Sequence, residues 1–598
     1  MKEKRGIVMK KISENLFIFQ DTCNVYVVKQ KDSAVLIDFG AGAVLGRLHE
    51  IGVSKVAAVL ITHHHRDQVQ GLHLAAEQEI PIYVPHNEQE LIVGANEHWQ
   101  SRELLNNYNS RQDRFSILYS VPITGTLKDY EDFCAGDTSF IVIPTPGHTT
   151  GSVSLIANID GYMTCFVGDL IFATGKLWSL AATQWTYNGG EGLPYTVLSL
   201  LSVLESGADR LLPSHGAPMT SDAIMPTIEN LLELIKLRRQ NPRLLQLRDT
   251  PYEYITPHVL RNRTSMSDSY VLVSESGKAM IIDFGYDFIA GIPAGVERSA
   301  RRPWLYTIPA LLEKFGVTSI DACLPTHYHD DHVAGFNLLK QVYGVKVICS
   351  DIFADILEFP SDYDLPCLWY DPIKVDMRAS ASFRWEEHEI LLHPLPGHTR
   401  YAVAVEFIAD GKRFLCGGDQ YADSDGLHCN YVYKNVTGSG DFIETAELYN
   451  RIAPDYLLTG HWGAIPYTAE YGKEILERGK ELKRLHDVLL PSQDWGNSFI
   501  VEFYPFTATV GPNAIVDVEV RVTNPLDKPA DVNIEFCLPP GFTPEGSMSR
   551  QALPREVICF LVQLQVPDVP VRRERISCNV FVEGKPYGQQ GEMLVSVV

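Results

Sequence analysis

The sequence predicts two layered α/β domains in tandem, followed by a domain built only of β-strands. A set of histidine- and aspartate-containing segments occurs twice in the same order along the chain. In both copies short β-branched runs alternate with amphipathic helical patterns, which is typical of sheets covered by helices. After Pro491 the helical periodicity ends, and strand patterns separated by turn residues follow. We therefore expect domains at residues 1–248, 249–492 and 497–598.

The repeat rests on five pairs of matching segments. In the first copy they are Asp38-Phe-Gly, Thr62-His63, Pro146-Gly-His148, Gly168-Asp169 and His215-Gly. In the second copy they are Asp283-Phe-Gly, Thr326-His327, Pro396-Gly-His398, Gly418-Asp419 and His461-Trp-Gly. The spacing between the histidine of the third pair and the aspartate of the fourth is the same in both copies. Agreement over five segments in one order indicates a duplicated domain.

Local patterns place the secondary structure within the two copies. Strands are expected at residues 57–61, 140–143 and 346–349, because these runs are short and rich in β-branched residues. Helices are expected at 308–315 and 336–343, where apolar residues recur at helical spacing. A long amphipathic helix is expected at 469–490 and closes the second copy.

The C-terminal domain has a different pattern of apolar and polar residues. Residues 516–522 alternate strictly between apolar and charged side chains, as a half-buried strand should. Further strands are expected at 532–536, 557–564, 576–582 and 593–598, with Pro, Gly and Asn turns between them. This spacing is typical of an immunoglobulin-like β-sandwich. None of the repeated segments occurs there, so we expect an accessory module whose partner is a protein or a glycan.

The composition limits the classes of partner. The 598 residues carry a formal net charge of −23, which repels phosphate backbones and disfavours nucleic acid. No apolar run reaches the roughly 18 residues that a membrane helix needs, and the first twenty residues lack the apolar core of a signal peptide. The eleven cysteines are scattered without a Cys-x-x-Cys pair, as in reduced cytoplasmic proteins. We expect a cytoplasmic protein that acts on a small-molecule substrate.

The most informative segment is His327-Tyr-His-Asp-Asp-His332, which directly follows an apolar, strand-like run. Imidazoles and carboxylates packed into six residues are poor material for a core and good ligands for a divalent metal. Alternate positions of an extended segment point to one side, so His327 and His329 can share one cation. Asp331 and His332, on the following turn, can share a second one. These ligand types suit zinc, iron or manganese.

The order of the segments, HxHxDH followed by GH, GD and GH, resembles that of the metallo-β-lactamase superfamily in both copies. The resemblance implies an αββα sandwich with two metal ions, taken as zinc, at one edge. In the second copy it implies a first metal held by His327, His329 and His398, a second held by Asp331, His332 and His461, and Asp419 as the bridge. The corresponding residues of the first copy are His63, His65 and His148, then Asp67, Gln68 and His215, with Asp169 as the bridge.

One position departs from the pattern. Gln68 stands where the second copy has His332, and an amide oxygen is a poorer ligand than imidazole for these metals. The second metal site of the first copy is therefore expected to be weak or empty, and catalysis is expected in the second copy. Two interpretations of the first copy remain: a working site with one firm metal, or a scaffold that retains most of its ligands.

The expected activity is hydrolysis. A dinuclear centre, with two zinc ions or with iron or manganese instead, would activate water against an ester, lactone, thioester or related bond. Asp331 is the carboxylate expected to relay the proton. One alternative is an iron-dependent oxidoreductase, such as a sulfur dioxygenase, on the same fold. Another is a non-catalytic scaffold that carries a binding module.

Several residues near the motifs have two interpretations. Asp38 and Asp283, which end apolar strands, either orient a ligand imidazole or are solvated in a turn. Tyr401 and Trp462 either line the substrate pocket or pack against their neighbours. An insertion of the second copy is expected to be a solvated loop rather than an anion clamp, and it contains Arg298, Arg301 and Arg302.

Overall fold

The computed structural model describes most of the chain. The described residues are 9–101, 115–185, 191–238, 243–287, 289, 306–422, 435, 438, 440–489, 500–544 and 546–598. The chain divides into two compact units, Met1–Pro251 with Tyr286–Leu311, and Tyr252–Gly285 with Leu312–Val598. No helix in the described part of the chain combines the length and the apolar character needed to cross a lipid bilayer.

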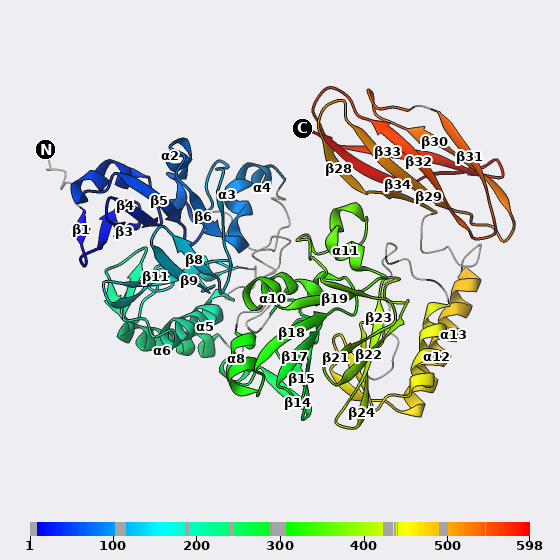
Figure 1. The fold of residues 1–598 in the computed structure, drawn as a ribbon, viewed down its shortest axis with the longest axis horizontal. Helices are drawn as coiled ribbons and strands as arrows, with labels where there is room; N and C mark the ends of the chain where they lie inside the picture. The colour runs from blue at the N-terminus through cyan, green and yellow to red at the C-terminus, as the bar shows by residue number, and fades with distance from the viewer. Residues whose placement is uncertain are drawn as a thin grey trace. The chain divides into compact units, whose positions relative to one another are not determined.

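The first copy contains two sheets, drawn in blue to green in Figure 1. The first sheet is antiparallel from β1 to β4 and parallel from β4 to β7. Its strands are β1 (Lys10–Lys11), β2 (Leu16–Gln20), β3 (Asn24–Gln30), β4 (Ser33–Ile37), β5 (Lys55–Leu60), β6 (Ile82–Pro85) and β7 (Gly125–Leu127). The second sheet has the order β13-β12-β11-β10-β9-β8. Its strands are β8 (Asp132–Ala135), β9 (Thr138–Pro144), β10 (Val153–Ile159), β11 (Tyr162–Gly168), β12 (Arg210–Pro213) and β13 (Met219–Thr220).

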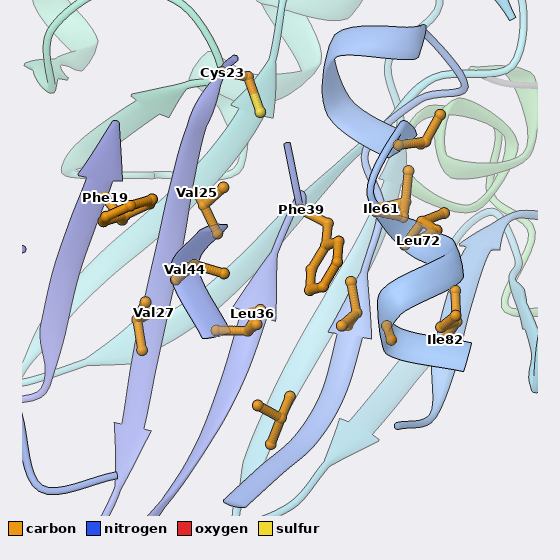
Figure 2. Packing of buried hydrophobic residues seen from close by; sticks show 14 of the residues in the cluster. Phe19, Cys23, Val25, Val27, Leu36, Phe39, Val44, Ile61, Leu72 and Ile82 are labelled. Atoms are coloured by element: carbon orange, nitrogen blue, oxygen red, sulfur yellow. The ribbon is translucent and has the colours of Figure 1, made fainter. Parts of the chain in front are cut away.

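Strand β4 shows why the two sheets form layers. Successive side chains of a strand point to opposite faces. Ala34 and Leu36 belong to the apolar cluster that joins the first sheet to its helices, and Figure 2 shows part of this cluster. Val35 and Ile37 belong to a second cluster, which lies between the two sheets and includes residues of β9 to β12. Both faces of β4 are therefore buried.

Helices complete the layers of the first copy. They are α1 (Arg66–Val69), α2 (Leu72–Glu77), α3 (Glu90–Val93), α4 (Ala95–Ser101), α5 (Gly192–Glu205), α6 (Ile224–Leu237) and α7 (Leu244–Asp249). Leu72 of α2 and Ile92 of α3 pack in the cluster of the first sheet. Helices α5 and α6 pack against the second sheet in a third cluster. The result is the predicted order of helix, sheet, sheet and helix.

The second copy repeats this arrangement of strands. Its first sheet contains β14 (Tyr252–Thr256), β15 (Val259–Asn262), β16 (Tyr270–Val273), β17 (Lys278–Ile282), β18 (Ser319–Leu324), β19 (Lys346–Ser350) and β20 (Met377–Ala379). Its second sheet contains β21 (Ser382–Trp385), β22 (His388–Pro394), β23 (Val403–Ala409), β24 (Lys412–Gly418), β25 (Tyr456–Thr459) and β26 (Ala464–Pro466). The helices are α8 (Thr307–Lys314), α9 (Asp330–Val333), α10 (Phe336–Tyr343), α11 (Ala354–Glu358), α12 (Asp441–Ile452) and α13 (Ala469–Leu489).

The C-terminal region consists of two sheets, drawn in orange to red in Figure 1. One has the order β27-β29-β32, and the other has the order β28-β34-β33-β30-β31. The strands are β27 (Val501–Tyr504), β28 (Thr507–Val510), β29 (Ile515–Thr523), β30 (Ala530–Cys537), β31 (Ser547–Ala552), β32 (Val557–Gln565), β33 (Val571–Val582) and β34 (Lys585–Val597). One apolar cluster joins the two sheets, so this region is a β-sandwich.

The fold class expected from the sequence is confirmed. The predicted strands of the two copies lie in β5, β9 and β19, and the predicted helices correspond to α8, α10 and α13. All strands expected in the C-terminal region are present, and β27, β28 and β31 are additional. Residues Arg298, Arg301 and Arg302 lie outside the described residues.

Candidate metal centres

The seven predicted ligands of the second copy come from the ends of four strands. His327, His329, Asp331 and His332 follow β18, and α9 begins at Asp330, so Asp331 and His332 lie in its first turn. His327 forms an isolated antiparallel bridge with Ala402, and His329 forms one with Leu368. The other three ligands follow further strands: His398 comes after β22, Asp419 after β24 and His461 after β25.

Folding brings these side chains together in two groups. The first group contains His327, His329 and His398, and the second contains Asp331, His332, Asp419 and His461. Within each group the candidate ligand atoms lie within 4.8 Å of one another. Asp419 lies between the groups, because its Oδ2 is 3.6 Å from Nε2 of His398 and 3.1 Å from Nε2 of His461.

The first group has the properties of a cation site. Nε2 of His398 faces Nδ1 of His329 at 3.2 Å. Among the described residues, the buried Nε2 of His327 has no hydrogen-bond partner, an arrangement that costs free energy unless another ligand satisfies the atom. Burial lowers the pKa of His327 well below its ordinary value and the pKa of His329 to about 3. Both imidazoles are therefore neutral at physiological pH, which is the form that binds metals. A divalent cation fits this set.

The second group is richer in charge. Burial alone would raise the pKa of Asp419, but His332 outweighs burial and holds this pKa well below its ordinary value. Burial alone would lower the pKa of His332, but Asp419, Asp331 and Asp283 raise it well above its ordinary value. The pKa of His461 is raised in the same way, because Asp419 outweighs burial. Two carboxylates facing two imidazoles form a ligand set that compensates a dication.

Asp283 orients one of these imidazoles. Its carboxylate accepts a hydrogen bond from Nδ1 of His332 at 2.9 Å, and others from the backbone N of Thr326 at 2.7 Å and its hydroxyl at 2.8 Å. Asp283 adopts a left-handed conformation with φ of 57°, which turns the chain sharply after β17. Of the two interpretations of this residue, the structure supports the orienting one.

Gly418 makes close packing at the centre feasible. It has φ of 51°, and a Cβ atom there would lie 2.6 Å from the hydroxyl oxygen of Thr326. Glycine avoids both the strained backbone and the collision. Asp419 can therefore approach the histidines that follow Thr326.

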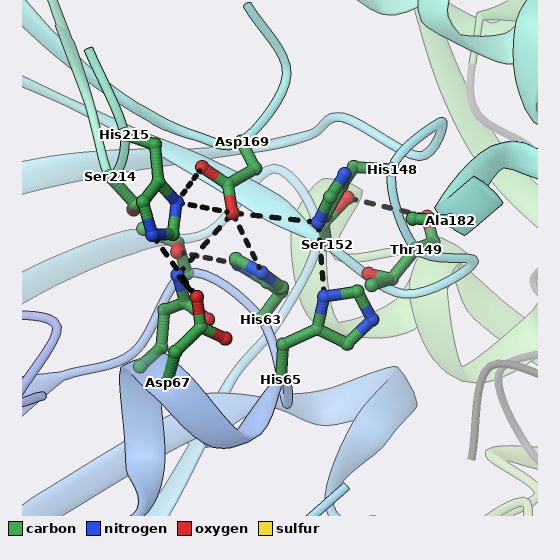
Figure 3. Close-up of polar contacts among 12 residues, drawn as sticks. His63, His65, Asp67, His148, Thr149, Ser152, Asp169, Ala182, Ser214 and His215 are labelled. Carbon is green, nitrogen blue, oxygen red and sulfur yellow. Dashed lines mark hydrogen bonds and ion pairs between the residues drawn. The ribbon is translucent and has the colours of Figure 1, made fainter. Parts of the chain in front are cut away.

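The first copy forms two corresponding groups, shown in Figure 3. One group contains His63, His65 and His148, with Nε2 of His148 at 3.0 Å from Nδ1 of His65. The other contains Asp67, Asp169 and His215. Nε2 of His215 is 3.1 Å from Oδ2 of Asp67, and its Nδ1 is 2.8 Å from Oδ1 of Asp169. Burial lowers the pKa of His63 and His65 well below the ordinary value.

Gln68 lies at the position of His332 and is fully buried. Its amide nitrogen is 3.3 Å from carboxylate oxygens of both Asp67 and Asp169. With the amide turned over, the nitrogen would donate to Oδ1 of Asp67 at 2.7 Å. In both orientations the amide donates to an acidic ligand. Gln68 thus occupies one of the carboxylates that a second cation would need.

Asp38 has a different partner from Asp283. Since Gln68 offers no imidazole, Asp38 accepts a short hydrogen bond from the hydroxyl of Ser214, besides those from Thr62. Ser214 stands where the second copy has Gly460. Burial raises the pKa of Asp38 to about 7. The two copies therefore differ at two linked positions: Gln68 in place of His332, and Ser214 in place of Gly460.

Three residues at these centres were not expected from the sequence. Glu88, fully buried after β6, accepts hydrogen bonds from the backbone N of His64 at 2.8 Å and of Gly151 at 2.9 Å. It therefore links the loop of His63 and His65 to the loop of His148. Burial would raise the pKa of Glu88, but His64, whose Nδ1 is 2.9 Å away, lowers it.

The other two unexpected residues are Gln420 and Trp178. In the second copy, Oε1 of Gln420 accepts a hydrogen bond from the backbone N of His398 at 2.9 Å. In the first copy, the ring of Trp178 stacks on His215 with a centroid separation of 4.1 Å and an interplanar angle of 4°. Gln420 directly follows the Gly-Asp segment, which is a usable sequence signal. Neither Trp178 nor Glu88 belongs to a motif, and no spacing in the sequence indicates them.

Tyr401 and Trp462 lie beside the second copy's ligands. The rings of Tyr401 and Tyr328 meet edge to face at 6.1 Å, and Tyr328 contacts His329 at 4.7 Å. Trp462 meets the ring of His461 at 5.8 Å. Both residues therefore form part of the surroundings of the metal centre.

Comparison with known proteins agrees with this geometry. The model of the metallo-beta-lactamase superfamily matches residues 18–215 and 263–419, more than half of the chain. A hydroxyacylglutathione hydrolase of Tolumonas auensis is 27% identical over 167 residues, which cover 27% of this chain and 52% of that protein. A hydroxyacylglutathione hydrolase of Bdellovibrio bacteriovorus is 26% identical over 177 residues, which cover 29% of this chain and 56% of that protein. The chain spans about half the length of these two curated relatives.

Part of this chain also aligns with solved structures. BJP-1, a subclass B3 metallo-β-lactamase of Bradyrhizobium japonicum, aligns with a TM-score of 0.31 and 18% identity over 40% of this chain and 96% of that chain. The family assignment rests on the two matched ranges rather than on this alignment. By that match, the chain belongs to the metallo-β-lactamase superfamily.

Proposed function

We propose that the protein is a metal-dependent hydrolase whose working centre lies in the second copy. The observation that carries this proposal is the complete set of seven converging imidazoles and carboxylates, together with Asp283 behind His332. In the first copy Gln68 stands in place of His332, and Ser214 binds the carboxylate that corresponds to Asp283. We therefore assign the first copy at most a subsidiary role. We propose zinc as the metal, two ions in the second copy, with iron or manganese as the alternatives.

The residues suggest how the reaction proceeds. Two divalent cations, when bound, lower the pKa of a water molecule and polarise the carbonyl oxygen of the substrate. Asp331 is half-buried, and its Oδ2 lies 3.4 Å from Nε2 of His461. We assign Asp331 the proton transfer: its Oδ2 accepts the proton of the attacking water and returns one to the leaving group. Asp283 keeps His332 in one tautomer and orientation throughout.

The names of the relatives support a proposal for the substrate class. The similar proteins of Tolumonas auensis and Bdellovibrio bacteriovorus are named for the hydrolysis of hydroxyacylglutathione, which is a thioester. We therefore propose a thioester or a related ester or lactone as the substrate. We also propose a cytoplasmic location, which reduced cysteines fit. For the C-terminal β-sandwich we propose an immunoglobulin-like fold and an accessory role.

The test uses the full-length protein stripped of metal and reloaded separately with zinc, iron or manganese. Release of thiol from acylated glutathione is expected with the loaded protein, and hydrolysis of lactone and ester panels is measured in parallel. Asp331→Asn should abolish turnover while leaving the protein folded. A loaded protein that is inert on every panel would refute the proposal. Iron at full stoichiometry in the isolated protein, with oxygen uptake, would instead favour the dioxygenase alternative.

A further inference from the structure

The C-terminal β-sandwich contacts the segment 360–368 of the second copy, within the same compact unit. The hydroxyl of Thr507 donates a hydrogen bond to the carbonyl oxygen of Ser361 at 2.9 Å. The backbone N of Phe506 donates to the carbonyl oxygen of Asp362 at 2.8 Å. Beside them, the rings of Tyr504 and Tyr363 meet edge to face at 5.5 Å. These contacts fix the beginning of the segment to β27 and β28.

The end of the same segment contacts the metal-binding loop. The backbone N of Asp330 donates to the carbonyl oxygen of Cys367 at 2.9 Å. The next residue, Leu368, forms the isolated bridge with His329. Asp330 begins α9, which carries Asp331 and His332. The segment therefore connects the β-sandwich to residues of both ligand groups.

A second connection passes through Tyr401, three residues after His398. A cavity of about 70 Å³ is lined by Tyr401 and Tyr363 from the second copy and by Tyr504 and Arg521 from the β-sandwich. Tyr401 in turn packs against Tyr328, which stands between His327 and His329. Aromatic side chains thus lead from the β-sandwich to the first ligand group.

The first copy holds the corresponding loops differently. Gly151 stands at the position of Tyr401, and His64 stands at the position of Tyr328. Glu88 links these two residues from within the copy, through the backbone N of each. In the second copy Phe353 stands where the first copy has Glu88. The pairing of β6 and β19 with their neighbours aligns these two strands, and each residue follows its strand at the same distance along the chain. The internal carboxylate link is thus absent from the described second copy, where the β-sandwich contacts the segment next to the metal-binding loop.

We propose that the C-terminal β-sandwich positions the metal-binding loop of the second copy, with Thr507 and Tyr504 as positioning residues. The inference deepens the proposed function, because it rests on the second copy being the metal centre. Loss of the hydrogen bond of Thr507 or the ring contact of Tyr504 should let His329 and α9 move more freely. The ligands would then bind a cation less tightly. No new chemistry is assigned to the β-sandwich itself.

The test uses the full-length chain carrying His63→Ala and Asp169→Ala, which confines firm metal binding to the second copy. Thr507→Val removes the hydroxyl donor at nearly unchanged volume, and Tyr504→Leu removes the ring contact. Thr507→Ser keeps the donor and should behave as the parent. Thr509→Val, two residues along β28 at an exposed position, is the matched control. Zinc affinity is measured by competition with a chelator well below the unfolding temperature, and kcat and KM are measured in parallel.

We expect Thr507→Val and Tyr504→Leu to weaken zinc binding by about three- to tenfold, less than the roughly 10- to 100-fold typical of direct partners of ligands. We expect kcat to fall with them and Thr509→Val to match the parent. Tyr363→Leu breaks the ring contact from the other side and should reproduce the loss without altering the β-sandwich. Variants that lower only the unfolding temperature, with zinc affinity and kcat within twofold of the parent, would overturn the inference. A parent that binds zinc but hydrolyses nothing would refute the proposed function, and the zinc affinities would still decide the inference.

Discussion

Asp283 accepts a hydrogen bond from Nδ1 of His332 at 2.9 Å, which leaves Nε2 of that imidazole directed towards Asp419. The contact sets both the tautomer and the orientation of a predicted ligand. In the first copy, the equivalent carboxylate of Asp38 binds the hydroxyl of Ser214 instead. The two copies therefore differ at the ligand position, His332 or Gln68, and also in the partner of the carboxylate next to it.

Replacing Asp283 with Asn should weaken metal binding in the second copy by about 10- to 100-fold, because the amide no longer enforces the tautomer of His332. Competition with a chelator, with metal counted by atomic emission, measures the loss. Asp38→Asn is the matched change in the first copy, where no imidazole is held. If both variants lose metal equally, the contact has no special role.

Restoring the second site of the first copy should require two changes. Gln68→His supplies the imidazole, but Ser214 still occupies Asp38. We therefore expect the double variant Gln68→His/Ser214→Gly to bind one additional metal ion per chain and Gln68→His alone to bind it more weakly. Metal stoichiometry after dialysis reports the result. Equal stoichiometry of the double variant and the parent would contradict this expectation.

Removing the charge of Glu88 should destabilise the first copy. In Glu88→Gln an amide N–H would face one of the two backbone N–H groups that the carboxylate now satisfies. Leaving a buried backbone N–H without an acceptor costs about 1 to 3 kcal/mol of unfolding free energy. Denaturant titration of the metal-free chain measures the shift, and Glu77→Gln, exposed on α2, is the control. A shift as small as that of the control would show that the link is dispensable.

Acid should release the two metals of the second copy in order. The pKa values of His327 and His329 are lowered, so protons compete poorly for the first group. The pKa values of His332 and His461 are raised, so protons compete for these imidazoles at higher pH than for His327 and His329, and protons displace the second cation first. Metal counts after dialysis at about pH 7.5 and about pH 5.5 should show loss of one ion per second copy. Simultaneous release of both ions would contradict the order.

The sequence predicted which histidines and aspartates the fold brings together, but it did not predict the residues that support them. His327, His329 and His332 are close in sequence, so local geometry alone predicts their convergence, and the repeated segments predict the distant ligands. Glu88 could not be foreseen, because its partners His64 and Gly151 lie far away in sequence and meet only when the sheets pack. The contact of Thr507 with Ser361 has the same origin, since neither residue belongs to a motif.

The fold likewise contains strands that the sequence predicts and strands that it does not. Strand β29 was recognisable because its charged and apolar residues alternate, whereas β31, with the sequence SMSRQA, is exposed along almost all of its length. Among the described residues it pairs with β30 alone, at the edge of its sheet. An edge strand with polar residues on both faces gives no periodic signal. Strand β29 was therefore predictable and this edge strand was not.

Because β4 is covered on both faces, the turn at Asp38 that follows it is fixed by the packing of the whole first copy. The same packing holds the ligand-bearing ends of the neighbouring strands, so we expect the centre to keep its shape when its ions are exchanged. Exchange of one metal for another should then proceed with little rearrangement of the chain. A crystal form of the empty protein should accordingly tolerate soaking with several different ions without losing its lattice.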